Sequence, residues 1–451
     1  MLQKIASAST RWSTRWVPDA WVIAVILTVV AFILGLIFTK ATAYQLVQNW
    51  GTGFWVLLSF GMQMCLIIMT GYILATTPLF SRMLNGLASL PKGNNKSAIA
   101  LMALVSMVLA WVNWGLSIVG SAVFVRFMVR KNKGVDYRLL VATAYLGLGV
   151  MWHSGLSASG PLLVATPKHF LEKDIGIIPI TETIFHPFNL LLALAVLVVL
   201  VIVGPLMHPK KEETIEADPE LVKEAGFETP PRPKASEMTP ALWIEHSPII
   251  NLIVAVSGII WLAWHFSQKG WAGINLDVVN FMFLVVGVLL HWTPASFLKA
   301  ALEGGSFIWG VVIQFPFYAG IFGIIKFSGL ADVMGDWFTA IASKETYPFI
   351  VVWYSGFLNY IVPSGGSKWA IEAPYIMTAA KNLDVSWPVT VIAYAWGDMV
   401  TDVIQPFWAI PLLGVAKLGF RDIMGYCMVY FMIYMVVISI GFLALPYMFP
   451  Y

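Results

Sequence analysis

The sequence has little charge and almost no cysteine. Only 11% of its 451 residues are Asp, Glu, Lys or Arg, whereas 59% are hydrophobic. Soluble globular domains carry about 25% charged residues, and a chain with so few could not build a comparable water-exposed surface. The composition therefore indicates a polytopic membrane protein. The net charge of +3 gives no reason to expect a nucleic-acid partner, because basic residues in such a chain follow its membrane topology.

The two cysteines, Cys65 and Cys427, lie in separate apolar segments. Buried thiols of this kind usually serve as packing residues, so we expect no disulfide and no metal site. The sequence also lacks metal-spaced His/Cys clusters, a phosphate-binding loop, and a nucleophile elbow in a strand–turn–helix setting. We therefore predict that the protein is not an enzyme. A membrane enzyme acting on lipid or polyprenyl substrates is the alternative from a different class.

Long apolar runs predict the helices, because about 20 apolar residues span a bilayer. Simple spans are expected at 21–38, 54–74, 188–207, 248–266, 276–292, 305–326 and 424–447. Four further apolar regions are interrupted by Gly, Pro, Asn or Ser, namely 98–130, 138–165, 347–380 and 387–417. We interpret the first and third as re-entrant hairpins and the other two as membrane helices broken at their centres. Irregular backbone at membrane depth is tolerated only where it is buried in protein or lines a cavity.

The positions of lysine and arginine predict how the chain is oriented in the membrane. Most of the 27 basic residues fall in segments that are cytoplasmic if the N-terminus is inside, as the positive-inside rule requires. We expect residues 1–20 to form a cytoplasmic interfacial helix. The polar, proline-containing segment 208–247 is expected to be a flexible cytoplasmic linker.

The two halves of the chain have the same residue types, Gln, Asn and Pro, in the same order and at similar spacings. Spacings of 50 and 48 residues separate Gln63, Asn113 and Pro161, and spacings of 45 and 47 separate Gln314, Asn359 and Pro406. We predict a first membrane repeat at 21–207, a connecting span at 248–266, a second repeat at 276–423, and a final span with an external C-terminus at 424–451. An odd number of crossings before the second repeat inverts it. The expected fold is thus an all-α polytopic membrane protein with two inverted-topology repeats, each with a re-entrant hairpin and a broken transmembrane helix, an arrangement typical of secondary transporters.

Polar residues at these breaks are the candidate site. Helix N-termini suit a carboxylate, and exposed carbonyls suit a cation. The predicted substrate-binding residues are Asn113, Ser117, Ser157, Ser159, Asn359, Ser364, Gly365, Gly366, Ser367 and Lys368. The predicted ion-coupling residues are His153, Asp398, Thr401, Asp402 and Gln405. The alternative is that these Ser, Gly and Asn residues only allow close packing of helices, and that Gln63 and Gln314 bridge helices.

Lys368 is the one basic residue expected within the membrane, and a buried lysine needs a partner. Asp402, Asp398 and Glu372 are the nearest acids in the expected architecture. Either Lys368 forms a structural ion pair, or it attracts a substrate carboxylate while an acid carries a proton or coordinates Na⁺. His153 is either a proton relay or a hydrogen-bonded core residue. If a metal binds at all, we expect Na⁺ near Asn113, Asn359 and Asp402.

Five stretches together resemble a known family: WVNWGLSIVGSAV, HSGLSASGPLLVATP, TIFHPFNLLL, VPSGGSKWAIEAP and GDMVTDVIQPFWAIPLLGVAKLGFRDIMGYC. They resemble the bacterial short-chain fatty acid transporter family, the acetoacetate and butyrate uptake type within the wider ion-transporter superfamily. The resemblance implies a carrier in the bacterial inner membrane that takes up small monocarboxylates with H⁺ or Na⁺ by an elevator-like motion. It implies no cofactor beyond a coupling Na⁺, and leaves a homodimer open. A cation/proton antiporter and a dicarboxylate carrier of the same superfamily are the alternatives.

The family pattern more often has Gln where Lys368 stands and Asn where Asp402 stands. Two opposite charges at these positions suggest a compensating pair between the second hairpin and the second broken helix. We further expect the hairpins and broken helices to form one transport domain. The spans at 21–38, 54–74, 276–292 and 305–326 would form the scaffold, and Asn113 and Asn359 would approach each other near the midplane.

Overall fold

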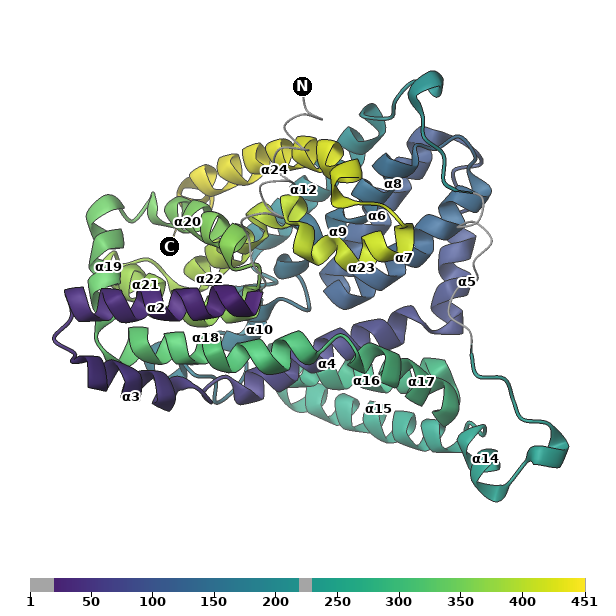
Figure 1. Ribbon diagram of the computed structural model, residues 1–451, viewed down its shortest axis with the longest axis horizontal. Coiled ribbons are helices and arrows are strands. Elements are labelled where there is room, and N and C mark those ends of the chain that lie inside the picture. Colours follow the sequence, from purple (N-terminus) through teal and green to yellow (C-terminus); the bar gives the residue numbers. More distant parts are fainter. Residues whose placement is uncertain (1–19, 219–228, 451) are drawn as a thin grey trace.

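The structure is a computed structural model that describes residues 20–218 and 229–450. The interfacial helix expected at 1–20 lies almost wholly outside these residues. Within them the chain is helical and contains no β-strand (Figure 1). An all-α fold is therefore confirmed for the described part of the chain.

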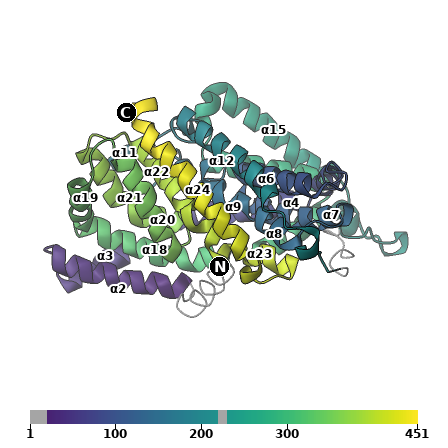
Figure 2. The ribbon, with the colours of Figure 1, turned by 90° about the horizontal axis from the view of Figure 1, so that it is seen from above.

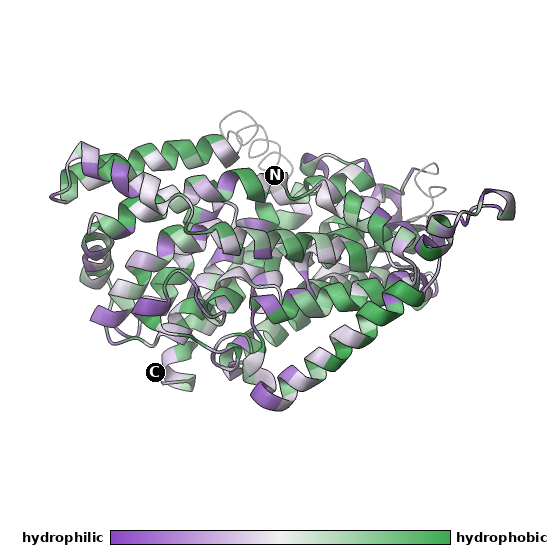
Figure 3. Cartoon of the chain, turned by 90° about the horizontal axis from the view of Figure 1, so that it is seen from below, coloured by the Kyte–Doolittle hydropathy of each residue, from purple (hydrophilic) through white to green (hydrophobic). Residues whose placement is uncertain are grey.

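Eight helical segments of the described chain are long and apolar enough to span a membrane. They are Trp21–Phe38, Leu58–Ala75, Asn95–Val112, Pro187–Leu206, Ile249–Gly273, Trp309–Phe327, Trp387–Ala416 and Phe420–Met448. In Figure 3 the helices are largely hydrophobic, and hydrophilic residues gather at loops and helix ends. The expected span at 276–292 is the shorter helix α16 (Leu276–His291). The last helix, α24 (Phe420–Met448), has 29 residues and is about 43 Å long at 1.5 Å per residue, which is enough to span with a tilt.

Both expected hairpins have the predicted helix–break–helix form. The first consists of α6 (Asn95–Val112) and α7 (Trp114–Lys131), which pack along each other. Asn113 breaks them with an extended backbone (φ −159°, ψ 123°), and its Oδ1 accepts a hydrogen bond from Leu116 N–H at 2.9 Å. This is an ordinary N-cap for α7. Whether either hairpin enters and leaves on one side of the bilayer stays a prediction.

The second hairpin is more open. Its arms are α20 (Tyr347–Ile361) and α21 (Gly365–Asn382), and the helix α22 (Trp387–Asp398) packs against both. The last residue of α22 is therefore held beside the first turns of α21. This packing positions the charged groups described below.

Both regions expected to be broken helices are interrupted at their centres. The first runs through α8 (Tyr137–Ala144), α9 (Leu146–Val150), the 3₁₀ turn η1 (Trp152–Ser154) and α10 (Ser159–Val164). The second continues from α22 through the 3₁₀ segment η6 (Met399–Ile404) into α23 (Pro406–Ala416). At the first break, a Cβ on Gly155 would fall 2.7 Å from the Trp111 Cα of the hairpin. Glycine is needed there because the backbone of α6 approaches so closely.

Four helices of 10–12 residues were not expected. They are α3 (Ala43–Gly53), α5 (Pro78–Leu87), α17 (Pro294–Gly305) and α19 (Leu330–Ile341). Three of them begin at a threonine whose side chain caps the helix (Thr42, Thr77 and Thr293), so local capping fixes their ends.

These helices strengthen the evidence for a repeat. The order α2 (Ala20–Phe38), α3, α4 (Leu58–Ala75), α5, hairpin, broken helix and α12 (Pro187–Leu206) recurs as α16, α17, α18 (Trp309–Phe327), α19, hairpin, broken helix and α24. Helices α2 and α3 pack against α18, and their counterparts α16 and α17 pack against α4. Reciprocal contacts of this kind are the pattern that a two-fold relation produces. Inversion of the second repeat across the membrane stays a prediction.

The helices form two layers. In Figure 1, α2, α3, α18, α4, α16 and α15 (Ile249–Lys269) lie along one side, and the hairpins, α22 to α24 and α12 lie on the other. Seen from above in Figure 2, α24 runs diagonally between α19–α22 and α6–α9, and it contacts α12, α8 and η6. The described parts of the 208–247 segment contain only short turns and α14 (Pro240–Glu245).

Two smaller expectations are met in the described chain. Cys65 and Cys427 are buried and form no disulfide. Gln63 bridges helices, since its Nε2 donates to Asp277 Oδ1 of α16 at 2.6 Å. The partner expected for Gln314 stays a prediction.

Gly323 provides a test of the contact between the repeats. A Cβ there would press on Asn49 O and lie 2.8 Å from Gly53 Cα of α3. We expect Gly323→Ala to force α18 from α3 and to destabilise the protein by about 1–3 kcal/mol, seen as a lower unfolding temperature in detergent. The control is Gly310→Ala on the same helix, where the nearest atom is Gln314 Nε2 at 3.7 Å. Equal unfolding temperatures for the two variants would contradict the packing.

Candidate functional site

Lys368 lies at the centre of a buried charge cluster in the second repeat. Its Nζ donates to Ser355 O at 2.9 Å and to Ser355 Oγ at 2.6 Å. It also lies 3.0 Å from Asp398 Oδ1 and 3.4 Å from Glu372 Oε1. The lysine and glutamate side chains are 0% exposed and that of Asp398 is 1% exposed. Removing one partner of a buried ion pair strongly destabilises a protein, because the other charge is left without compensation. The cluster therefore holds α20, α21 and α22 together.

The predicted pairing of Lys368 with Asp402 is wrong. The lysine pairs with Asp398 and Glu372 instead. Asp398 ends α22, which packs against α21, whereas Asp402 lies one turn further along in η6. The Asp402 carboxylate accepts hydrogen bonds from Trp152 Nε1 at 2.9 Å and Asn359 Nδ2 at 2.7 Å. The change from α-helix to 3₁₀ helix turns it away from the lysine.

His153 connects the cluster to the first repeat. Its Nδ1 lies 2.7 Å from Asp398 Oδ2, and its Nε2 accepts a hydrogen bond from Gly160 N–H at 3.2 Å. Because Nε2 is the acceptor, a neutral ring carries its proton on Nδ1 and donates it to the carboxylate. The ring is stacked on Trp152, with centroids 4.2 Å apart. His153 is therefore a hydrogen-bonded core residue in this conformation.

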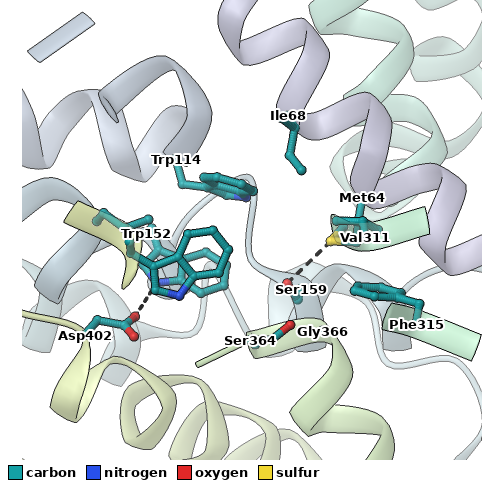
Figure 4. A pocket seen from close by; sticks show the side chains of 13 residues that line it. Met64, Ile68, Trp114, Trp152, Ser159, Val311, Phe315, Ser364, Gly366 and Asp402 are labelled. Atoms are coloured by element: carbon teal, nitrogen blue, oxygen red, sulfur yellow. Dashed lines mark hydrogen bonds between the residues drawn. The ribbon is translucent and has the colours of Figure 1, made fainter. Parts of the chain in front are cut away.

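A pocket lies beside this cluster (Figure 4). Both repeats contribute to it. Its apolar lining consists of Met64, Ile68, Trp114, Leu148, Trp152, Val311, Phe315 and Trp408. Its polar lining consists of Ser159, Ser364, Asp402 and the backbone of Gly365 and Gly366.

The N-terminus of α21 opens into this pocket. The first N–H groups of a helix have no partner within it, and the side chain of Ser364 does not cap them. The first hairpin differs, because Asn113 caps α7. A Cβ on Gly365 would lie 2.6 Å from Trp152 Cη2 and 2.8 Å from His153 Cε1. Glycine therefore lets this helix end approach the broken helix of the first repeat.

The predicted substrate residues divide into two groups. Ser159, Ser364, Gly365 and Gly366 line the pocket, together with Asp402, which was expected to serve ion coupling. The others do not line it.

Three of these residues bind backbone groups of the first hairpin or of the neighbouring helix α4. Asn113 Nδ2 donates to Ile67 O at 3.3 Å, and Ser117 Oγ donates to Ser106 O at 2.8 Å. Ser157 Oγ accepts from Trp114 N–H at 2.9 Å. The close-packing alternative therefore describes these three residues better in this conformation.

In the second repeat, polar residues hold the hairpin against η6. Asn359 Nδ2 donates to Thr401 Oγ1 at 3.1 Å as well as to Asp402, and Gln405 Nε2 donates to Tyr360 O at 3.1 Å. The hydroxyl of Ser367 is buried without a hydrogen-bond partner among the described residues. No distance between Asn113 and Asn359 is established, so their approach stays a prediction.

Sequence reasoning missed several members of the site. Glu372 was weighed as a neighbour of Lys368 but was not assigned to the site, although its spacing of four residues on one helix places it one turn away. Ser355 and the pocket tryptophans Trp114, Trp152 and Trp408 were not named. An apolar sequence gives no signal that separates a pocket-facing tryptophan from a lipid-facing one.

A solved structure shares the fold of this chain. The crystal structure of the YdaH transporter from Alcanivorax borkumensis matches it with a TM-score of 0.57 at 14% sequence identity, covering 96% of this chain and 99% of that one. The match and the eight membrane-length helices of the described chain define a polytopic α-helical membrane protein.

The family follows from sequence. The family model described as short chain fatty acid transporter matches residues 1–445. A relative in Escherichia coli strain K12, provisionally named a short-chain fatty acid transporter, is 38% identical over 98% of this chain and 99% of its own. One in Haemophilus influenzae with the same provisional name is 35% identical over 95% and 96%. The chain belongs to the short-chain fatty acid transporter family.

The ion cluster makes a stability prediction. Asp398→Asn leaves Lys368 without its nearest carboxylate, and losing one partner of a buried pair costs about 3–5 kcal/mol. We expect a large fall in unfolding temperature, partly reversed in Lys368→Gln/Asp398→Asn. The control is Lys344→Gln, which breaks the exposed Lys344–Asp384 pair at 2.9 Å and should have little effect. If the double variant is no more stable than Asp398→Asn alone, the pairing has no energetic importance.

Proposed function

We propose that the protein is a secondary active transporter of short-chain monocarboxylates, such as butyrate or acetoacetate, coupled to H⁺ or Na⁺. The observation that carries this proposal is the uncapped N-terminus of α21 facing a pocket lined mainly by apolar side chains. Helix N-termini bind anions through free N–H groups and the positive end of the helix dipole. A short fatty acid has the matching shape, with one anionic head and a small apolar tail.

The tail would lie among the tryptophans. Trp114 is 6.2 Å from Trp152 and 5.6 Å from Trp408 between ring centroids, each pair with edge-to-face geometry. Met64 and Phe315 close the side formed by α4 and α18. Burying each CH₂ in such a lining contributes about 0.8 kcal/mol, so even a short chain gains useful affinity.

The pocket favours a monocarboxylate over a dicarboxylate. One helix N-terminus faces it, and its lining contains the Asp402 carboxyl but no lysine, arginine or histidine. A second substrate carboxylate would therefore find no second group in the lining that favours an anion. The cation/proton antiporter is the second candidate, because Glu372, Asp398 and Asp402 lie together with a single lysine.

For mechanism, we propose alternating access by an elevator-like movement of the hairpin layer against the layer of α2, α4, α16 and α18. The pocket supports this proposal, since its lining comes partly from α4 and α18 and partly from the hairpins and broken helices. Movement between these layers would carry the α21 end of the pocket away from Met64 and Phe315.

Uptake by the purified protein tests the function. We expect labelled butyrate or acetoacetate to enter proteoliposomes when an inward H⁺ or Na⁺ gradient is imposed, and an empty vesicle is the control. Cation movement without any effect of butyrate would favour the antiporter. Uptake that neither gradient accelerates would contradict coupling.

Chain-length selectivity tests the pocket. Phe315 is 6% exposed and lines it, so Phe315→Ala adds room for a longer tail. We expect the hexanoate-to-butyrate ratio of kcat/KM to rise about fourfold or more, the value of one additional buried CH₂. The matched control is Phe357→Ala, because Phe357 is 71% exposed. An equal ratio in both variants would place the substrate tail elsewhere.

A further inference from the structure

The ammonium of Lys368 fills a cage of oxygen atoms. Its four contacts are one backbone carbonyl, one hydroxyl and two carboxylate oxygens, at 2.6–3.4 Å. The ring of Tyr394 covers another side, with its centroid 4.8 Å from Nζ, which is a cation–π contact. Carbonyl and carboxylate oxygens are also the groups that hold inorganic cations. The cage therefore has the chemistry of a cation site, and the chain's own lysine occupies it.

The cage also lies where a carrier holds a coupling ion. Its oxygens come from the hairpin arms α20 and α21 and from the end of α22, directly before the break into η6. Transporters of broken-helix architecture coordinate their coupling cations at such breaks. Lys368 does not line the substrate pocket, so its charge is directed to the cage and not to the substrate.

We propose that Lys368 is a tethered cation that permanently fills the coupling-ion position, so that transport needs no Na⁺ and is coupled to protons. This inference rests on the proposed function and specifies its coupling ion. No bond is formed or broken beyond the transfer of a proton between a carboxyl group and water.

The charge balance identifies where protons would bind. Asp398 has both Lys368 and His153 as partners. Glu372 shares the lysine and receives Ser355 Oγ–H at 3.2 Å, and its Oε2 has no hydrogen-bond partner among the described residues. The hydrogen bonds to Asp402 come from neutral donors. One lysine cannot balance the charge of three buried carboxylates. A proton bound to Glu372 or Asp402 would therefore lower the free-energy cost of burying that group.

Other titratable groups face this cluster. Glu372 interacts electrostatically with Tyr347 and Tyr354 of α20, Tyr375 of α21 and Tyr394 of α22. Asp402 interacts in the same way with Tyr145, Tyr394 and Tyr434. His153 of η1 and Asp398 of α22 form the neighbouring pair. The tyrosines remain neutral donors in the physiological range, so they do not alter the charge count.

Two measurements on the full-length protein test the proposal, both with Na⁺ replaced by choline at constant ionic strength. The first is the unfolding temperature in detergent, which a bound ion raises. We expect no Na⁺ effect on the wild type, and a rise with Na⁺ in Lys368→Ala, whose vacated cage can take the ion. Lys368→Gln serves if the alanine variant does not fold. Lys381→Ala, at the exposed end of the same helix, should behave as wild type.

The second measurement is butyrate uptake driven by a pH gradient. Wild-type uptake in choline should stay within about twofold (about 0.4 kcal/mol) of uptake in Na⁺. Uptake by Lys368→Ala in choline should fall at least about tenfold (about 1.4 kcal/mol) and recover partly with Na⁺.

The outcomes separate the two proposals. A wild type that transports butyrate only with Na⁺ overturns the tethered cation and leaves the proposed function standing. A wild type that transports no butyrate or acetoacetate under either gradient overturns the proposed function itself. Variants at Lys368 whose unfolding temperature ignores Na⁺ show that the cage is not a cation site.

Discussion

The second repeat depends on burying one lysine. Burying an unpaired ammonium in a dry interior is costly, and Lys368 has Ser355, Glu372 and Asp398 as its partners. These partners come from both arms of the second hairpin and from the broken helix. His153 extends the network to the first repeat through Asp398. One charge thus fixes how four segments meet and holds the first turn of α21 against the pocket.

The arrangement separates two electrostatic tasks. The positive end of the α21 dipole faces the pocket. The charge of the lysine, one turn further along α21, is paired with the carboxylates of Glu372 and Asp398. A helix terminus stabilises an anion by only about 0.3–2 kcal/mol. A carrier benefits from such moderate attraction, because a carboxylate paired directly with a buried lysine would be slow to leave. In the proposed function, the tryptophans of the pocket would supply the remaining affinity by contacting the apolar tail.

Much of the fold could be predicted from the sequence, because Gly, Pro, Asn and Ser residues that interrupt a long apolar run have few structural explanations. The helix–break–helix form of the hairpins, the broken helices and the position of Ser364 to Gly366 at one of the breaks follow from that rule. The choice between Asp398 and Asp402 could not, because both lie on one broken helix, and the onset of 3₁₀ geometry decides which faces the lysine. Short amphipathic helices such as α3 and α17 could not be predicted, because they lie next to longer apolar runs in the sequence. The pocket tryptophans could not be predicted either, because in an apolar sequence they cannot be distinguished from lipid-facing tryptophans.

We propose that the substrate carboxylate binds at the N-terminus of α21 and not at Lys368. A crystal structure with 4-bromobutyrate would show where the substrate lies, because anomalous scattering locates the bromine. We expect bromine among Trp114, Trp152 and Trp408, with the carboxylate within hydrogen-bond distance of Gly365 or Gly366 N–H. A carboxylate bound to Lys368 Nζ, with the lysine released from Asp398, would contradict it.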